Sequence, residues 1–193
     1  MRVAPHLLLV ALLSVGALTG CVSSEPGVAR PGEDVILRTE IQRRVAEIPY
    51  MHGVELVTNL ERLAEIGEPA AHYLVGALDS PQALTRSSVA WTLGAMGDRR
   101  NIPALRELLD DRVPGVRYQA ASSLVELGDA SGFPVLVEGL ADADIQARYK
   151  CFESLRDATG NDFGYEHDAD PEFRRAAVAR WRSWLDGVRA SAL

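Results

Sequence analysis

A 31-residue repeat constrains this chain of 193 residues more than any other feature. Arg86, Arg117 and Arg148 are 31 residues apart, and neighbouring apolar positions keep the same step. The equivalent residues are Ala90, Ala121 and Phe152; Leu93, Leu124 and Leu155; Leu74, Leu105 and Leu136; and Leu78, Leu109 and Leu140. A period of this length is typical of repeat architectures, in which each unit buries its apolar face only against its neighbours.

The apolar spacing within one repeat is helical. Val116, Ala120 and Leu124 follow an i, i+4, i+8 spacing along one helix face, and a second, shorter helix precedes them. Gly128 is placed to end the longer helix in a left-handed conformation, and Pro103 falls near the first turn of the shorter one. The sequence therefore predicts an all-α fold, an α–α superhelix of about four helical hairpins with terminal capping helices.

Residues 98–128 resemble the HEAT repeat, and in particular the short bacterial form called the phycobilisome-lyase HEAT-like repeat. The resemblance extends less strictly from about His52 to Leu185. The matching residues are Pro103, Leu105, Leu109, Asp111, Val116, Arg117, Ala120, Ala121, Leu124 and Gly128. This resemblance implies a solenoid of stacked helical hairpins.

The repeated arginines have two interpretations. In HEAT repeats the matching arginine usually pairs with the turn aspartate of its own or the next unit, which implies Asp111 or Asp142 as the partner of Arg86, Arg117 and Arg148. The alternative is a ladder of cations that binds an anion along the stack. We expect structural pairing.

Terminal helices are expected to close the stack. Residues 34–47 place Ile36, Ile41 and Val45 near one helix face. After the helix start at residues 170–172, an apolar stripe is formed by Phe173, Ala177, Trp181 and Trp184. We therefore expect one repeat domain over residues 34–187, followed by a tail over residues 188–193.

The N-terminal residues resemble a bacterial lipoprotein signal. An apolar run over residues 7–18 ends in Leu18-Thr19-Gly20-Cys21, which is similar to the lipobox. The resemblance implies that residues 1–20 are a signal peptide and that Cys21 is lipidated, with residues 21–33 as a flexible linker. The alternative is an ordinary secretory signal with an incidental cysteine.

Lipidation of Cys21 implies a location in the cell envelope. Two or three acyl chains anchor a protein stably, because each buried methylene contributes about 0.8 kcal/mol. Val22 is not the aspartate that retains lipoproteins in the inner membrane of some bacteria, which favours the outer membrane if the organism has one. The membrane, through this anchor, is thus an expected partner.

Charge and cysteine content exclude some classes of protein. The formal net charge is -7, and a negative surface repels phosphate backbones, so we expect no nucleic-acid partner. Cys21 and Cys151 are too few for a disulfide framework. Cys151 occupies a core position of the repeat and is interpreted as a buried apolar residue, the alternative being a reactive thiol.

The sequence contains no catalytic constellation. His52, His72 and His167 lack the spacings of a metal site, and no nucleophile elbow occurs. An acidic loop over residues 161–172 lacks the pattern of an EF-hand, although calcium binding there stays open. We therefore predict a protein without enzymatic activity, metal or cofactor.

A candidate binding surface lies on the outward side of the longer helices, each of which is the second helix of its hairpin. Trp91, Tyr118 and Tyr149, together with Arg156, are expected to be exposed there. Tryptophan, tyrosine and arginine dominate interface hot spots, so these residues are candidates for protein binding. The alternative is that the rings pack sideways between repeats.

The leading hypothesis is a membrane-tethered, non-enzymatic binding or scaffolding module whose concave face takes an unknown protein or peptide. The runner-up is a ligand-handling or lyase-type protein acting on a bound small molecule, because HEAT-like lyases that attach bilin chromophores share this repeat. HEAT-like DNA glycosylases share it too, but they require a basic concave face. A third hypothesis is a spacer between other envelope proteins.

Overall fold

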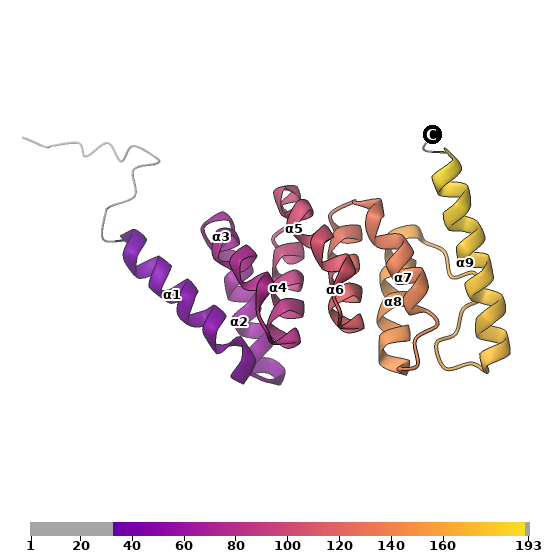
Figure 1. Cartoon of the computed structure of the whole chain (residues 1–193), viewed down its shortest axis with the longest axis horizontal. Helices are drawn as coiled ribbons and strands as arrows, with labels where there is room; N and C mark the ends of the chain where they lie inside the picture. Colours follow the sequence, from indigo (N-terminus) through magenta and orange to yellow (C-terminus); the bar gives the residue numbers. More distant parts are fainter. Residues whose placement is uncertain (1–32, 192–193) are drawn as a thin grey trace, which may run out of the picture.

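The computed structural model describes residues 33–191, so the lipobox-like sequence, Cys21 and most of the predicted linker lie outside the described residues. Helices follow one another in a row from α1 to α9 (Figure 1). Their bounds are α1 Glu33–Glu47, α2 Gly53–Ile66, α3 Glu68–Gly76, α4 Ala83–Ala95, α5 Ile102–Glu107, α6 Pro114–Glu126, α7 Phe133–Gly139, α8 Ile145–Thr159 and α9 Pro171–Ser191. Between residues 33 and 191, the other regular elements are short 3-10 turns.

The helices form four hairpins in two layers. The first helices are α1, α3, α5 and α7, and the second helices are α2, α4, α6 and α8. Helix α4 packs against α2 and α6, and α6 packs against α8, so the second helices form one continuous layer. Helix α1 packs against α3, and α9 packs against α7 on the side of the first helices. The prediction of an all-α superhelix is confirmed.

The turns follow the expected chemistry. Gly97 and Gly128 follow α4 and α6 and adopt left-handed φ angles of 68° and 75°. A side chain would strain the backbone in this conformation, so glycine is favoured at these helix ends. Pro103 and Pro134 lie in the first turns of α5 and α7, where a missing N–H group is tolerated. Helix α9 begins at Pro171 and continues to Ser191, beyond the domain boundary expected at residue 187.

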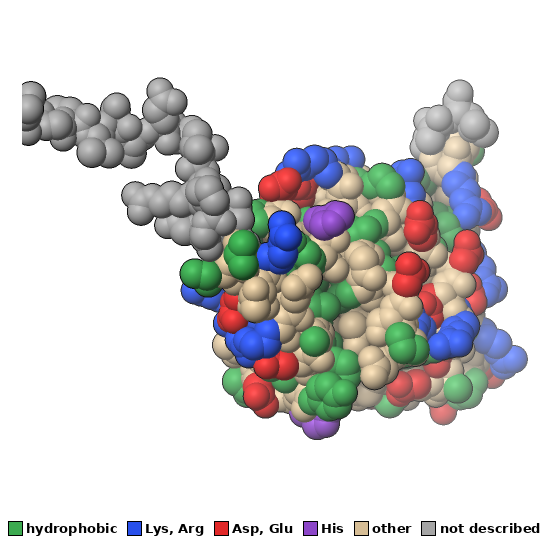
Figure 2. All heavy atoms as spheres, turned by 60° about the vertical axis from the view of Figure 1, so that its left-hand side comes forward, with side chains coloured by type: hydrophobic (Ala, Val, Ile, Leu, Met, Phe, Trp, Pro, Cys, Tyr) green, Lys and Arg blue, Asp and Glu red, His purple; other side chains and the backbone are tan. Residues whose placement is uncertain are grey.

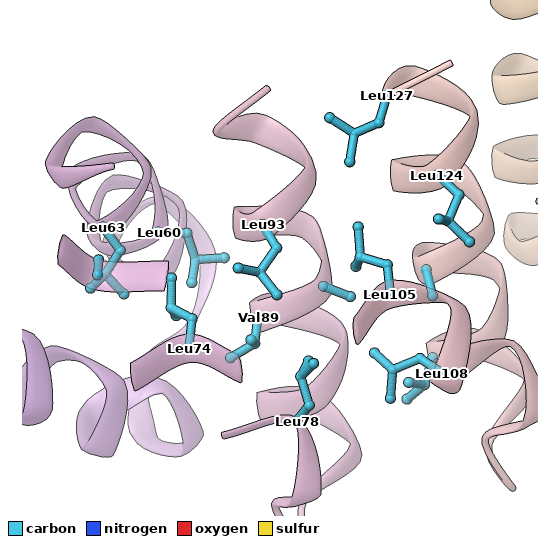
Figure 3. Close-up of a cluster of buried hydrophobic side chains, with 14 of the residues drawn as sticks. Leu60, Leu63, Leu74, Leu78, Val89, Leu93, Leu105, Leu108, Leu124 and Leu127 are labelled. Carbon is cyan, nitrogen blue, oxygen red and sulfur yellow. The ribbon is translucent and has the colours of Figure 1, made fainter. Parts of the chain in front are cut away.

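The core lies between the two layers. Leucine side chains from successive helices point toward one another in Figure 3, and Leu63, Leu74, Leu93, Leu105 and Leu124 are fully buried. Leu74, Leu93, Leu105 and Leu124 are positions that the 31-residue repeat marks as apolar, and Leu63 precedes Leu93 by 30 residues. Each such side chain contributes about 1.5–3 kcal/mol through burial, so stacking of neighbours accounts for the stability of hairpins that could not fold alone.

Helices α4 and α6 approach each other through small residues. A Cβ atom on Gly94 would lie 2.6 Å from the Cβ atom of Ser123, so only glycine fits at this position. The Ser123 hydroxyl donates a hydrogen bond to the Ala90 carbonyl at 3.0 Å. This contact fixes the spacing of the second helices at the centre of the stack.

The terminal helices cover the ends unequally. In α9, Ala177 and Trp181 are fully buried, whereas Phe173 is 71% exposed, because the later turns of the helix make its contacts with the stack. In α1, Ile41 is buried but Ile36 is 72% exposed. The predicted stripes are therefore wrong at Ile36 and Phe173.

Candidate ligand-binding face

The three repeated arginines share one contact. The Nη1 group of each donates to the carbonyl six residues earlier: Arg86 to Ser80 at 2.8 Å, Arg117 to Asp111 at 2.9 Å and Arg148 to Asp142 at 2.9 Å. The shared role of the ladder is thus to satisfy the carbonyl that ends the turn between the two helices of a hairpin. These guanidinium groups therefore have a structural role, because they hydrogen-bond to the backbone of the turn.

Arg86 also forms the expected ion pair. Its Nε and Nη2 groups donate to the two carboxylate oxygens of Asp111 at 2.6 and 2.8 Å, and both side chains are more than nine-tenths buried. These hydrogen bonds hold the pKa of Asp111 below its ordinary value and raise that of Arg86. The pair joins the second hairpin to the third.

The pairing predicted for Asp142 is wrong. Asp142 receives the hydroxyl of Tyr118 at 2.7 Å rather than an arginine of the preceding unit. The backbone N–H of Asp144, followed by this hydroxyl, lowers the pKa of the Asp142 carboxyl. Arg148 instead donates to the carbonyl oxygens of Ala143 and His167.

The four candidate binding residues do not form one surface. Tyr118 is only 8% exposed, because its ring joins the core and its hydroxyl reaches Asp142, so the expectation of an exposed ring is wrong. Trp91 is half-buried against the N-terminal core. Tyr149 is 41% exposed and meets the ring of His167 edge-on. Arg156 pairs with Glu153 on its own helix at 2.6 Å.

A hollow lies on the exposed side of the second helices, which we call the second-helix face. Its volume is about 270 Å³. All four second helices contribute to its lining, which consists of Val57 and Leu60 from α2, Ser87, Ser88 and Trp91 from α4, Gln119 from α6 and Lys150 from α8. Since the outermost helices of the layer line the same hollow, this face curves inward.

A smaller cavity of about 160 Å³ adjoins this hollow between α6 and α8. Gln119 and Lys150 line both spaces. Cys151 lines the smaller one and is 1% exposed, and burial raises the pKa of its thiol to about 12. The thiol therefore stays protonated at neutral pH and is not an activated nucleophile.

The sequence analysis found Trp91 but missed the rest of the hollow. Val57, Gln119 and Lys150 come from three different helices, and only the curvature of the face brings them together. One signal was available, because Lys150 is the only lysine in the chain.

The acidic loop before α9 is held against the stack. The Tyr165 hydroxyl donates to the Leu140 carbonyl at 2.6 Å, and the His167 carbonyl accepts from Arg148. Among the described residues, no three histidine, cysteine, aspartate or glutamate side chains gather as a metal site would require. None of the helices in the described range is long and apolar enough to span a bilayer.

Comparisons with known proteins agree with this architecture. Residues 71–156 match the family model of HEAT repeats, so the resemblance seen in the sequence is confirmed for this segment. The fold is similar to a chain in the complex of CpcE and CpcF of phycocyanin lyase from Nostoc sp. PCC7120, with 21% identity and a TM-score of 0.54. The match covers 75% of this chain and 99% of the other. Comparison with curated proteins gives no match.

The structural comparison corrects the prediction that the protein is not an enzyme. That prediction relied on the lack of a familiar catalytic motif, yet the similar fold occurs in a phycocyanin lyase. The lack of such a motif therefore does not separate a chain of this fold from lyases.

Proposed function

We propose that this chain is a ligand-handling HEAT-repeat protein of the lyase type, whose second-helix face binds a small, partly apolar molecule. The observation that carries the proposal is the hollow lined by all four second helices, with Val57, Leu60 and Trp91 as its apolar part. Small-molecule sites are concave and mostly apolar, with a few polar groups that fix orientation. The hollow combines these three apolar side chains with four polar ones, so it offers both an apolar surface and groups that can fix orientation.

The charge distribution supports a small molecule over a nucleic acid. The chain is acidic overall, and basic and acidic side chains are interspersed on the face seen in Figure 2. The larger hollow contains one charged residue, Lys150. A DNA-binding face would need a row of cations to neutralise successive phosphates.

The structure also favours a small molecule over a peptide that is read by exposed aromatic rings. Such a peptide would contact Trp91, Tyr118 and Tyr149 together, but Tyr118 is buried in the core. The remaining two rings differ in setting, since Trp91 lines the hollow and Tyr149 packs on His167.

A titration with 1-pyrenebutanol, a neutral apolar fluorophore, tests the proposal on the full chain. We expect saturable binding that is weakened about tenfold or more by Trp91→Ala and less by Val57→Ser, because both side chains line the apolar part of the hollow. Phe173→Ala, which removes an exposed ring elsewhere, is the matched control. Binding that responds to Phe173→Ala but to neither hollow variant would refute the proposal.

We also propose that the protein is tethered to the cell envelope through Cys21. The support is the lipobox-like sequence that ends at this residue. Cells expressing the full chain and supplied with radiolabelled palmitate should label the protein, and Cys21→Ser should abolish the label. Labelling that persists in Cys21→Ser would contradict the tether.

A further inference from the structure

Lys150 is the one cation that lines the hollow on the second-helix face. Each of the ten ion pairs between residues 33 and 191 is made by an arginine. The Lys150 ammonium has neither an ion pair nor a hydrogen bond to any described side chain, although its residue is exposed. A single cation thus faces a hollow without a protein partner.

Lys150 lies between two adjoining spaces, the larger hollow and the smaller cavity. On one side lies the larger hollow, with the apolar groups of Val57, Leu60 and Trp91. On the other side lies the smaller cavity between α6 and α8. Lys150 and Gln119 line both, so any molecule that extends from the apolar part toward α8 meets an ammonium and a primary amide.

We propose that the second-helix face binds an amphipathic carboxylate, with its apolar body against Val57, Leu60 and Trp91 and its carboxylate on Lys150. This inference rests on the proposed function and names the class of ligand. A charge-assisted hydrogen bond from the ammonium fixes the head, and the amide of Gln119, which lines the same two spaces, donates to the second oxygen. The apolar body supplies most of the affinity, whereas Lys150 supplies the choice of head group.

A carboxylate fits this site better than a phosphate ester. The lining of the larger hollow offers one cation, which balances one negative charge. The smaller cavity adds an acidic residue, Asp144, which repels a dianion more strongly than a monoanion. Phosphate recognition usually employs arginine forks or several backbone N–H groups, and the repeated arginines are already bonded to carbonyl oxygens.

Two probes of the same shape separate this inference from the proposed function. The full chain is titrated with 1-pyrenebutyrate, a carboxylate, and with 1-pyrenebutanol, its neutral counterpart. We expect the carboxylate to bind about fivefold to tenfold more tightly than the alcohol. Lys150→Met should remove this preference, and Lys150→Arg should retain most of it. Arg38→Met, which removes an exposed cation on α1, is the control and should change neither affinity.

The outcomes are distinguishable. Equal binding of the two probes, both weakened by Trp91→Ala, would overturn the carboxylate inference and leave the proposed function standing. No binding of either probe, or binding insensitive to Trp91→Ala and Val57→Ser, would overturn both. Circular dichroism of each variant confirms that a loss of binding is not a loss of fold, and Val57→Ser serves if Trp91→Ala does not fold.

A chemical experiment tests the same contact without a variant. Because Lys150 is the only lysine, an amine-reactive ester modifies it and, at most, the chain's N-terminal amine. We expect 1-pyrenebutyrate to slow modification of Lys150 at least threefold, while 1-pyrenebutanol at the same occupancy slows it less. Equal protection by the two probes would contradict a carboxylate contact.

Discussion

At two junctions between neighbouring hairpins, the equivalent turn aspartates bind different side chains. Between the second and third hairpins, Asp111 receives both ends of the Arg86 guanidinium. Between the third and fourth hairpins, the equivalent Asp142 receives the Tyr118 hydroxyl. In both turns the aspartate also accepts a backbone N–H two residues ahead, from Val113 and from Asp144.

The difference arises one position after the arginine. This position holds Ser87 in the second hairpin and Tyr118 in the third. The Ser87 hydroxyl donates within its own helix, to Leu84, so Asp111 remains available to Arg86. Tyr118 is long enough to reach the next turn, and Arg117 keeps its carbonyl contact and lies over the Tyr118 ring without an ion pair. The repeat therefore conserves the turn geometry, while the bond that joins two hairpins depends on one neighbouring residue.

The largest expected effect is at the Arg86 junction. Asp111→Ala leaves the buried Arg86 guanidinium without its counter-charge, and we expect the free energy of unfolding to fall by about 3–5 kcal/mol. Urea denaturation followed by circular dichroism measures the loss. The double variant Arg86→Met, Asp111→Leu should recover part of the lost stability, because it leaves no unpaired charge in the core. A loss below about 1 kcal/mol for Asp111→Ala would mean that the junction is held by apolar packing alone.

A smaller effect is expected at the Tyr118 junction. Tyr118→Phe keeps the ring in the core but removes the hydroxyl that Asp142 accepts, which should cost about 1–2 kcal/mol. Tyr149→Phe is the matched control. The Tyr149 ring is 41% exposed and meets the His167 ring edge-on, and its hydroxyl makes no hydrogen bond to a described residue. Equal effects of the two variants would show that the bond to Asp142 adds no stability.

Arg117 sharpens the comparison further. It is half-buried and makes the carbonyl contact of the ladder without an aspartate partner, so Arg117→Ala should cost about 0.5–1.5 kcal/mol. Arg86→Ala should cost clearly more in the same denaturation experiment. Similar losses would indicate that the carbonyl contact, and not the ion pair, is the main contribution of the ladder.

The smallest and most gradual effect is expected from pH. The folded chain lowers the pKa of Asp111 and Asp142, so both stabilise the fold above their ordinary pKa of about 3.9. This stabilisation is lost as the pH falls through the lower folded values. Stability measured from pH 5 to pH 2 should therefore fall less steeply in Asp111→Asn than in the unaltered chain. The residual slope contains the contribution of Asp142, and identical slopes would contradict the lowered pKa of Asp111.

Much of the fold could be predicted from local patterns. The 31-residue period, Gly128 and Pro103 could each be interpreted from the sequence alone, and all three interpretations were correct. Ile36 and Phe173 were not, because a helical stripe shows which face is apolar but not how far a neighbour extends along it.

The site could be predicted far less well. Trp91, Tyr118 and Tyr149 were expected on one exposed surface, yet an aromatic ring on these helices can reach the core, as Tyr118 does. The hollow depends on the curvature of four helices, which is the sum of small rotations between hairpins. Such rotations leave no trace in the period of the sequence.

The unequal closure of the two ends affects how the domain comes apart. At the α9 end, the buried Trp181 ring meets Phe163 and Trp184 edge-on, and Trp184 meets Phe133 in the same way. At the α1 end, Val35 and Ile36 remain largely exposed. In a row whose units touch only their neighbours, the weaker terminus unravels first. Amide hydrogens should therefore exchange earliest in α1 and last in the central hairpins, with α9 protected longer than its terminal position would imply.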